Sequence, residues 1–538
     1  MNRQTFAWDR SRNKLRQGEH PIEFLSILGL LLAALVLFGI NLGNLPLRDW
    51  DEGTVAQVAK EIWQDGVDSL GWLFPTLWGE PYLNKPPLVH GLIALFYSFG
   101  GVNEWTARLP GAMLTAFSVP LLYGIGREIF VSRIPAFFSA LIYLTLLPVV
   151  RHGRLAMLDG AVLCFEMLMI WSVLRSRRDL RACLGAGIGF GLICLTKGMM
   201  GLLLGAIALI FLAWDTPRLL RSSYLWLGLF LGSVPAIAWY AAQWLHYREA
   251  FISTGIVAQS LERVYTAVEG HSRPPWYYVW EIFKYSWPWL LFCLYGLRLA
   301  WENRHWSWAK LILVWSGVYF AAVSLMGTKL PWYIVPIYPA LALAGGAQLA
   351  EVCNWPSYRS YPRAWIAVLG LLALVASTGC IYFGFSEPPD RWLTIVFASV
   401  AWTMGVAAAL IAQRNGQFIP VLFWGMYVSL LLFFSSPHWN WELNEAYPVK
   451  PVAAVIKLGT PSNQVVYTSF DYQRPSLNFY SDHQVIPNTN EQLTQHWQES
   501  SHPYLLLDTE TFKQLKLESA QIIDKAPPNW VLVAKDND

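Results

Sequence analysis

The stretch that decides the fold is IAVLGLLALVASTGCIYFGF, residues 366–385, which contains no charged side chain. A helix of this length is long enough to cross a hydrocarbon core of about 30 Å. Similar uncharged runs occupy Phe24–Leu42 and Gly198–Trp214. Of the 538 residues, 55% are hydrophobic and only 14% are charged, whereas about a quarter of a soluble domain is charged. The sequence therefore predicts an integral membrane protein with many spans.

The hydrophobic runs predict an all-α polytopic bundle of thirteen transmembrane helices. The apolar segment Leu88–Phe99 is too short to span, and we interpret it as an interfacial or re-entrant helix. The predicted spans lie near residues 24–44, 108–126, 134–150, 161–175, 184–197, 199–214, 224–244, 285–301, 309–326, 333–350, 364–385, 393–412 and 418–435.

Charge supports this count and sets the orientation. With a cytoplasmic N-terminus, the basic arm and the short cytoplasmic loops hold most of the arginines near the spans, which is the positive-inside pattern. Counting 88–99 as a span would place the Arg175–Arg181 cluster outside. The basic residues assigned to the cytoplasm are Arg3, Arg10, Arg12, Lys14, Arg16, Arg127, Arg133, Arg175, Arg177, Arg178, Arg181, Arg218, Arg221, Arg298, Arg304, Lys310, Arg359, Arg363 and Arg414.

The predicted organisation has three parts. A cytoplasmic basic arm (1–23) precedes the membrane domain (24–435), which contains large external loops at 45–107 and 245–284. A small external α/β domain (436–538) follows, with strands expected at Gln464–Phe470, Leu477–Ile486, Tyr504–Leu507 and Trp530–Ala534. The six cysteines lie in or beside apolar spans, so no disulfide framework is expected. No basic strip with interleaved aromatic residues predicts a nucleic-acid partner.

Polar residues gather at the external ends of the spans. A transporter of lipid-linked sugars would concentrate such residues near the membrane midplane, so this pattern favours chemistry at the surface. Arg48-Asp49-Trp50-Asp51-Glu52 follows the first span and opens a predicted amphipathic helix. Asp51 and Glu52 fit two interpretations: they cap that helix, or one of them deprotonates an acceptor hydroxyl.

The second external feature is Pro81-Tyr82-Leu83-Asn84-Lys85-Pro86-Pro87. Lys85 is placed to meet a phosphate, and it equally fits a lysine that anchors an interfacial helix. Asp159 follows Arg151-His152-Gly153-Arg154; it is either a second active-site carboxylate or a salt-bridge partner of Arg154. Further cations on the same side are Lys197, Arg273 and Lys329, each of which also fits an interfacial anchor.

These motifs, in this order, resemble the GT-C type glycosyltransferases, specifically the lipid A aminoarabinose transferases and their bacterial relatives, which are kin to protein O-mannosyltransferases. The resemblance covers roughly the first 350 residues and fades beyond them. The matching pieces are Asp51-Glu52, Pro81-Tyr82 to Lys85-Pro86-Pro87, Asn103-Glu104 to Ala107-Arg108-Leu109-Pro110, Arg154 to Leu158-Asp159, Leu195-Thr196-Lys197-Gly198, His271 to Tyr278, and Lys329-Leu330-Pro331-Trp332-Tyr333 to Pro336 and Tyr338-Pro339-Ala340.

The resemblance implies an inverting transfer of a sugar from a polyprenyl-phosphate donor at the periplasmic side of the inner membrane. It implies that Asp51 is the base. The other residues that it assigns to the site are Glu52 and Asp159 (catalytic), Lys85, Lys197, Arg273, Tyr333 and Lys329 (donor phosphate), and His271, Arg154 and Arg108 (substrate cavity). The acceptor implied is lipid A, another lipid, a glycan or a protein.

Two positions depart from the family pattern. Asn84 stands where relatives commonly have glutamate, and Thr54 stands where they often have arginine. In the aminoarabinose transferases that glutamate helps to hold a metal, so we expect no cofactor, no metal and a sugar other than aminoarabinose. A flippase or transporter of lipid-linked sugars, and an inactive relative that acts as a binding partner, are the alternative functions.

Overall fold

The computed structural model describes residues 20–66, 69–356, 359–440, 448–462 and 464–535. Most of the predicted basic arm (1–23) lies outside these ranges. The chain divides into two compact units, each described here by itself. Unit 1 comprises Met1–Leu42, Leu83–Val89 and Gly111–Trp439, and unit 2 comprises Gly43–Tyr82, His90–Pro110 and Asn440–Asp538.

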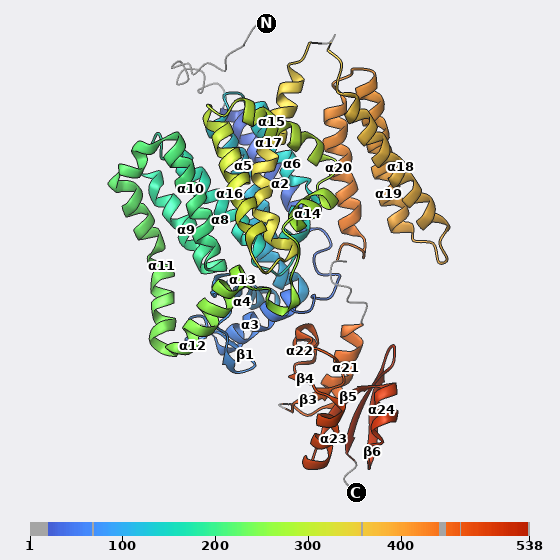
Figure 1. Ribbon diagram of the computed structural model, residues 1–538. Helices are drawn as coiled ribbons and strands as arrows, with labels where there is room; N and C mark the ends of the chain where they lie inside the picture. The colour runs from blue at the N-terminus through green and yellow to red at the C-terminus, as the bar shows by residue number, and fades with distance from the viewer. Residues whose placement is uncertain (1–19, 67–68, 357–358, 441–447, 463, 536–538) are drawn as a thin grey trace. The chain divides into compact units, whose positions relative to one another are not determined.

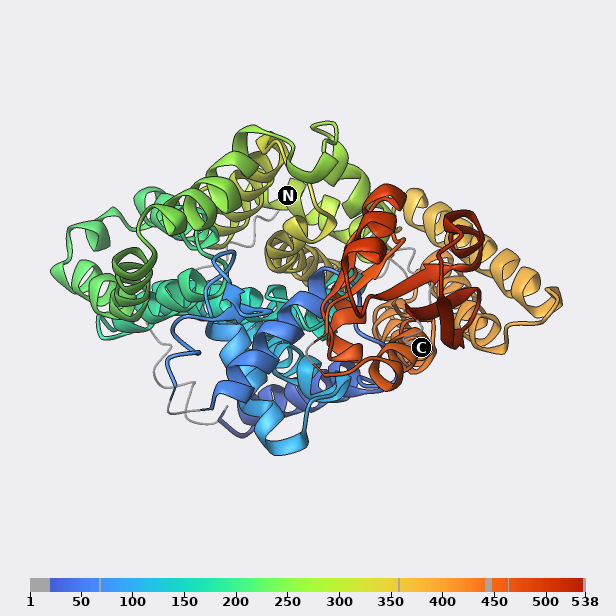
Figure 2. The ribbon, with the colours of Figure 1, turned by 90° about the horizontal axis from the view of Figure 1, so that it is seen from below.

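Unit 1 is a bundle of long apolar helices, several of which are seen end-on in Figure 2. Its last helices, α18 to α20, pack as a consecutive series. The helices that belong wholly or mainly to unit 1 are α2 (His20–Gly39), α5 (Glu104–Ile129), α6 (Arg133–Leu144), α7 (Leu147–Arg154), α8 (Asp159–Arg175), α9 (Ala182–Lys197), α10 (Met200–Asp215), η2 (Pro217–Arg221), α11 (Ser223–Tyr247), α12 (Glu249–Phe251), η3 (Ile252–Leu261), α13 (Glu262–Tyr265), η4 (Val268–Gly270), α14 (Tyr277–Tyr285), α15 (Trp289–Glu302), α16 (Ser307–Leu325), η5 (Pro331–Ile337), α17 (Tyr338–Cys353), α18 (Arg363–Phe385), α19 (Arg391–Ala412) and α20 (Phe418–Ser435).

Helices α9 and α11 pack backbone against backbone through paired glycines. A Cβ atom on Gly187 would lie only 1.8 Å from the carbonyl oxygen of Gly228, and one on Gly191 would lie 2.2 Å from that of Gly232. Both helices carry their glycines four residues apart, the spacing that lets helices approach closely in membranes. A larger residue at any of these positions would force the two helices apart.

Within the described ranges, eight helices are long and apolar enough to cross a membrane, and a ninth span results if α6 and α7 count as one. All thirteen predicted spans coincide with helical segments, but some are interrupted. The span predicted at 134–150 is two helices bent by 58°. The span predicted at 333–350 begins as the 3-10 helix η5. Proline explains both interruptions, because Pro148 and Pro339 each stand in the first turn after the break and lack the amide hydrogen of a continuous helix.

The first part of unit 2 contains α3 (Asp51–Asp65), the short antiparallel strands β1 (Thr76–Leu77) and β2 (Glu80–Pro81), and most of α4 (Leu88–Gly100), the helix expected there. The sequence predicts α3 correctly, but only its apolar stripe was expected to be covered. The structure also buries Gln57 and Lys60, because the C-terminal segment of unit 2 packs against α3 and supplies Asp482 to Lys60.

The C-terminal segment, coloured orange-red to red in Figure 1, contains a mixed five-stranded sheet. Its strand order is β4-β3-β5-β7-β6. Strands β4, β3 and β5 are parallel, whereas β7 runs antiparallel to β5 and β6. Leu505 and Leu507 point into one core cluster and Leu506 into the other, as the alternation of a strand requires. The elements are α21 (Val449–Gly459), β3 (Val466–Thr468), α22 (Pro475–Ser481), β4 (Val485–Pro487), α23 (Asn490–Glu499), β5 (Tyr504–Asp508), α24 (Thr509–Leu515), β6 (Ala520–Ala526) and β7 (Trp530–Lys535).

One strand prediction in this segment is wrong and one strand was missed. Leu477–Ile486 was expected to be extended, but the structure has α22 there and only then β4. Pro475 at the first position of α22 favours the helix, and its apolar residues pack on the sheet. Strand β6 escaped prediction because it is an edge strand whose central residues are exposed, so it lacks a hydrophobic alternation.

Asp482 links three elements of unit 2, since it pairs with Lys60 of α3 and Lys457 of α21. Hydrogen bonds from both lysines lower the pKa of its carboxyl group, although burial alone would raise it. Its φ of 59° is a left-handed conformation that asparagine also tolerates.

We therefore expect Asp482→Asn to destabilise the protein by about 1 kcal/mol at most at pH 7, because partly exposed pairs are screened by solvent. A lowered folded-state pKa gives stability that is present above the unfolded pKa of about 3.9 and is lost as the pH falls through the folded value. Thermal unfolding of wild type and variant in detergent should differ at pH 7 and converge below about pH 4. A difference that persists undiminished at pH 3 would contradict the assignment.

Candidate active site

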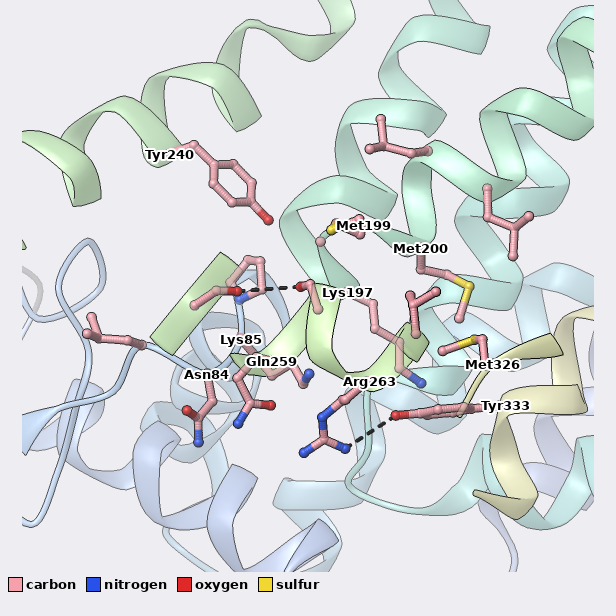
Figure 3. A pocket seen from close by; sticks show the side chains of 18 of the residues that line it. Asn84, Lys85, Lys197, Met199, Met200, Tyr240, Gln259, Arg263, Met326 and Tyr333 are labelled. Carbon is pink, nitrogen blue, oxygen red and sulfur yellow. Dashed lines mark hydrogen bonds between the residues drawn. The ribbon is translucent and has the colours of Figure 1, made fainter. Parts of the chain in front are cut away.

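A cavity of about 420 Å³ lies in unit 1, and cations and methionines line it together (Figure 3). Its size is within the range of ligand sites. Asn84, Lys85, Lys197, Tyr240, Gln259, Ser260, Arg263 and Tyr333 provide most of its polar lining, and Leu83, Met199, Met200, Leu202, Leu203, Trp239, Phe251, Val264, Val323 and Met326 most of its apolar lining.

Lys85 reaches the cavity from the segment that precedes α4. The two prolines after it restrict its backbone, so little conformational freedom remains to be lost on binding. This segment lies close to η3, because a Cβ atom on Gly255 would fall 2.9 Å from the carbonyl oxygen of Leu83. Helix η3 is a π-helix, a rare form that is frequent at functional sites, and it carries Gln259 and Ser260 into the lining.

Lys197 is the last residue of α9, which ends at Gly198 with a φ of 56°. Its Nζ atom donates to Oδ1 of Asp159 at 2.7 Å and lies 5.5 Å from the centre of the Tyr333 ring. Asp159 is 4% exposed and begins α8. The ion pair of Asp159 is therefore with Lys197, and its position is that of a counter-charge that holds the ammonium group in place.

Arg263 and Tyr333 meet at the cavity wall, where Nη1 of Arg263 donates to the Tyr333 hydroxyl at 3.4 Å (Figure 3). Backbone pairing holds the arginine in place. Amide hydrogens of Gly327 and Thr328 bond to the carbonyl groups of Val264 and Arg263, at 2.8 and 3.0 Å. The Gly327 backbone is so close to Thr266 that a Cβ atom would lie 2.6 Å from its oxygen. The motif around Lys329 thus fixes the segment that carries Arg263.

Arg273, predicted to bind the donor phosphate, is exposed and does not line the cavity. The structure brings together Lys85, Lys197 and Tyr333 of the predicted set and adds Arg263. Sequence reasoning missed Arg263 because it lies outside the matching motifs. One signal was available: Gly255, Gln259 and Arg263 are spaced by four residues, which places them on one face of a helix.

Lys329 and His271, also predicted site residues, belong to the paired backbone segments beside the cavity rather than to its lining. The Lys329 amide donates to the carbonyl oxygen of His271 at 3.1 Å. The Lys329 ammonium group donates to the carbonyl oxygen of Met326, and burial lowers its pKa. These contacts give Lys329 a structural role in shaping the loop.

Arg154 and Arg108, predicted to line the substrate cavity, are fully buried elsewhere. Arg154 donates to the carbonyl oxygens of Leu37 and Phe38, at 2.7 and 3.1 Å, so it stabilises the C-terminal end of α2. Its guanidinium group also stacks on the rings of Phe434 and Trp439, 4.7 and 4.8 Å from their centres.

In unit 2, the two neighbouring carboxylates at the start of α3 have different surroundings. Glu52 is 0% exposed and accepts two bonds from Arg108, at 2.8 and 2.7 Å. The same arginine donates to the carbonyl oxygens of Leu45 and Pro46. Asp51 begins the helix, keeps 18% of its side chain exposed and has Arg48 at 3.9 Å.

The chain is similar to known proteins in sequence and in fold. Residues 84–241 match the family model "Dolichyl-phosphate-mannose-protein mannosyltransferase". The undecaprenyl phosphate-alpha-4-amino-4-deoxy-L-arabinose arabinosyl transferase 1 of Pseudomonas fluorescens is 28% identical over 398 residues, 70% of each chain. An uncharacterized protein of Aquifex aeolicus is 25% identical and covers 86% of this chain and 88% of its own. The crystal structure of ArnT from Cupriavidus metallidurans bound to undecaprenyl phosphate has a TM-score of 0.76 at 19% identity, over 95% of this chain and 99% of that one.

These similarities agree with the resemblance to GT-C type glycosyltransferases, and the chain is a membrane glycosyltransferase. The matches favour this reading over the flippase alternative. The structural match to ArnT covers 95% of this chain, so it includes the region beyond residue 350 where the sequence motifs fade.

The placement of Arg263 makes a prediction with a matched control on the same loop. Arg263→Ala should weaken binding of a polyprenyl monophosphate by about 10–100-fold, the usual value of a hydrogen bond between charged groups. Arg273→Ala removes the same charge outside the cavity and should change binding little. Binding of both variants can be measured by thermophoresis in detergent. A loss in Arg273→Ala alone would restore the assignment made from the sequence.

Proposed function

We propose that the enzyme transfers a sugar, with inversion, from a polyprenyl-phosphate donor to a lipid, glycan or protein acceptor at the periplasmic face of the inner membrane. The observation that carries this proposal is the lining of the cavity. Lys85, Lys197 and Arg263 suit a phosphate, and the wall of Met199, Met200 and other apolar residues suits an isoprenoid chain. The ligand named in the ArnT structure, undecaprenyl phosphate, has both parts.

In this mechanism the acceptor oxygen attacks the anomeric carbon while the bond from that carbon to the phosphate oxygen breaks. Negative charge builds on the leaving phosphate, so contacts from Lys85, Lys197 and Arg263 strengthen in the transition state. Tyr333 adds a neutral hydrogen bond. Asp159 orients Lys197 through their ion pair. Asp51 takes the acceptor proton as the general base.

The proposed topology has thirteen spans, a cytoplasmic N-terminus and a periplasmic C-terminal α/β domain. This count treats the bent pair α6–α7 as one span and includes the shorter helices α9 and α10. The distribution of basic residues supports it. The same topology puts Lys85, Lys197 and Tyr333 on one side of the membrane.

We also propose that the donor sugar carries no amine. A protonated amino sugar is best met by a carboxylate, and position 84, where the resemblance implies a glutamate, holds asparagine in this chain. Asn84 and Gln259 instead present neutral amides, which suit sugar hydroxyls.

The function is tested with purified protein in detergent and undecaprenyl-phosphate donors labelled in the sugar. A transferase releases undecaprenyl phosphate without a second membrane compartment, whereas a flippase releases none. A neutral hexose donor should be turned over and the aminoarabinose donor should not. Preference for the aminoarabinose donor would overturn the proposal on the sugar while leaving the reaction class intact.

Asp51→Asn should lower turnover by about 10²–10⁴-fold, the usual contribution of a positioned general base. The amide preserves the shape of the side chain, so donor binding should stay near the wild-type value. Turnover is measured by donor release with acceptor present. A variant with near-wild-type turnover would rule out Asp51 as the base.

The enzyme should retain its activity in EDTA. Divalent cations prefer carboxylate or imidazole ligands, and Asn84 offers only a neutral amide where relatives commonly have glutamate. Donor release is compared before and after chelation, with zinc and magnesium added back separately. Loss in EDTA followed by recovery with either ion would contradict this expectation.

A further inference from the structure

The C-terminal segment of unit 2 makes a buried contact beside Asp51. Asp49 is 2% exposed, and its Oδ1 atom accepts the amide hydrogen of Ser476 at 3.0 Å and the hydroxyl of the same residue. Its Oδ2 atom accepts from Nη1 of Arg474 at 3.0 Å. Asp49 thus caps the start of α22, although it lies more than 400 residues away in sequence.

This cap replaces a local one. The residue that precedes α22 is Arg474, whose side chain makes no capping bond, and Pro475 has no amide hydrogen to satisfy. The first amide that needs a partner is that of Ser476, and Asp49 supplies it. The interaction therefore satisfies the first free amide of α22 and, at the same time, the buried carboxylate of Asp49.

Contacts within the C-terminal segment fix the position of the Arg474 side chain. Its guanidinium group lies 4.6 and 4.7 Å from the ring centres of Phe470 and Tyr472 and donates to the Tyr472 hydroxyl at 2.8 Å. Phe470 in turn packs on Trp530, with 4.0 Å between ring centres. The sheet domain therefore presents a fixed cation to Asp49.

The backbone between Asp49 and Asp51 is strained. The amide of Asp51 bonds to the carbonyl oxygen of Asp49 at 2.6 Å, and Trp50 between them has φ 56° and ψ −66°. These values describe a γ-turn with a positive φ, a rare conformation for a residue with a side chain. Such a turn persists only where its surroundings hold both of its ends.

Both ends are held. Asp49 is bound to α22, while Glu52 on the far side is bound to Arg108 and accepts the amide of Arg48 at 3.0 Å. Gly53 then lies directly against α22, since a Cβ atom on it would fall 2.6 Å from the nitrogen of Ser476.

We propose that the C-terminal sheet domain is a positioning element of the catalytic site: Arg474 and Ser476 hold Asp49 and thereby fix the γ-turn that orients Asp51. The proposal rests on the proposed role of Asp51 as the base. We call the contacts from Arg474 and Ser476 to Asp49 the clamp. The clamp gives the domain a role in turnover in addition to any role in stability.

The test compares two contacts that join the C-terminal domain to the α3 region. Asp49→Ala removes the whole contact at the turn and Arg474→Gln removes its ion pair, whereas Asp482→Asn removes the ion pair with Lys60 further along α3. We expect Asp49→Ala to lose about 10²-fold in kcat with an unchanged KM for the donor, as displacement of a catalytic group does. Arg474→Gln should lose a smaller part, because Ser476 still bonds to Asp49. Asp49→Asn keeps the acceptor oxygen for Ser476 and should recover part of the loss. Asp482→Asn should keep the wild-type kcat.

Hydrogen exchange of the full-length protein gives a readout that does not depend on catalysis. In Asp49→Ala and Arg474→Gln, the amides of Asp51 and Ser476 should exchange faster while the peptides of α5 and α8 stay protected. If Asp51→Asn is active, the base assignment fails, and faster exchange at Asp51 in these variants still supports the clamp. If Asp51→Asn is inactive while Asp49→Ala keeps both its kcat and its exchange pattern, the clamp is wrong and the base assignment stands. Equal losses of kcat in Asp482→Asn and Arg474→Gln would also overturn the clamp.

Discussion

A charged group inside an apolar bundle is stable only where neighbouring groups replace the hydration that it has lost, and this constraint shapes the enzyme from α2 to α22. Arg154 meets it with backbone carbonyls at the end of α2 and with two aromatic rings. Glu52 and Arg108 meet it with each other. Each arrangement fixes the geometry of the chain around it, because moving either partner would leave a buried charge without its hydrogen bonds.

The same constraint is met in different ways by two cations of the cavity, Lys197 and Arg263. Lys197 is neutralised in part by Asp159, so it presents a fixed hydrogen-bond donor more than a full net charge. Arg263 is held instead by a tyrosine hydroxyl and by the backbone pairing of its own segment with Gly327 and Thr328. A cavity built in this way keeps its donors pointed inward before any anion arrives, which lowers the reorganisation needed on binding.

Most of the helices and part of the cavity could be predicted from the sequence. The remaining features could not, for physical reasons. Uncharged runs locate the helices, since few other structures bury so long an apolar segment in a membrane. Lys85, Lys197 and Tyr333 were identified by motif and do line one cavity. Arg154 and Arg108 do not line this cavity; they bond to buried carbonyl groups and to Glu52, and a motif does not show whether a residue binds a ligand or such a group. Arg263 and the strained turn at Trp50 were missed because each depends on segments distant in sequence: the loop around Gly327 for one, and α22 for the other.

Helix geometry accounts for the division of labour between Asp51 and Glu52. Successive residues of an α-helix point about 100° apart, so two adjacent carboxylates cannot share one environment. The rotation of α3 about its axis points Glu52 toward Arg108, with which it forms a buried ion pair, and leaves Asp51 partly exposed. Both oxygens of Glu52 already accept hydrogen bonds from Arg108, whereas Asp51 keeps 18% of its side chain exposed. The buried pair and the γ-turn then act together, since one fixes where α3 begins and the other fixes the direction from which the chain enters it.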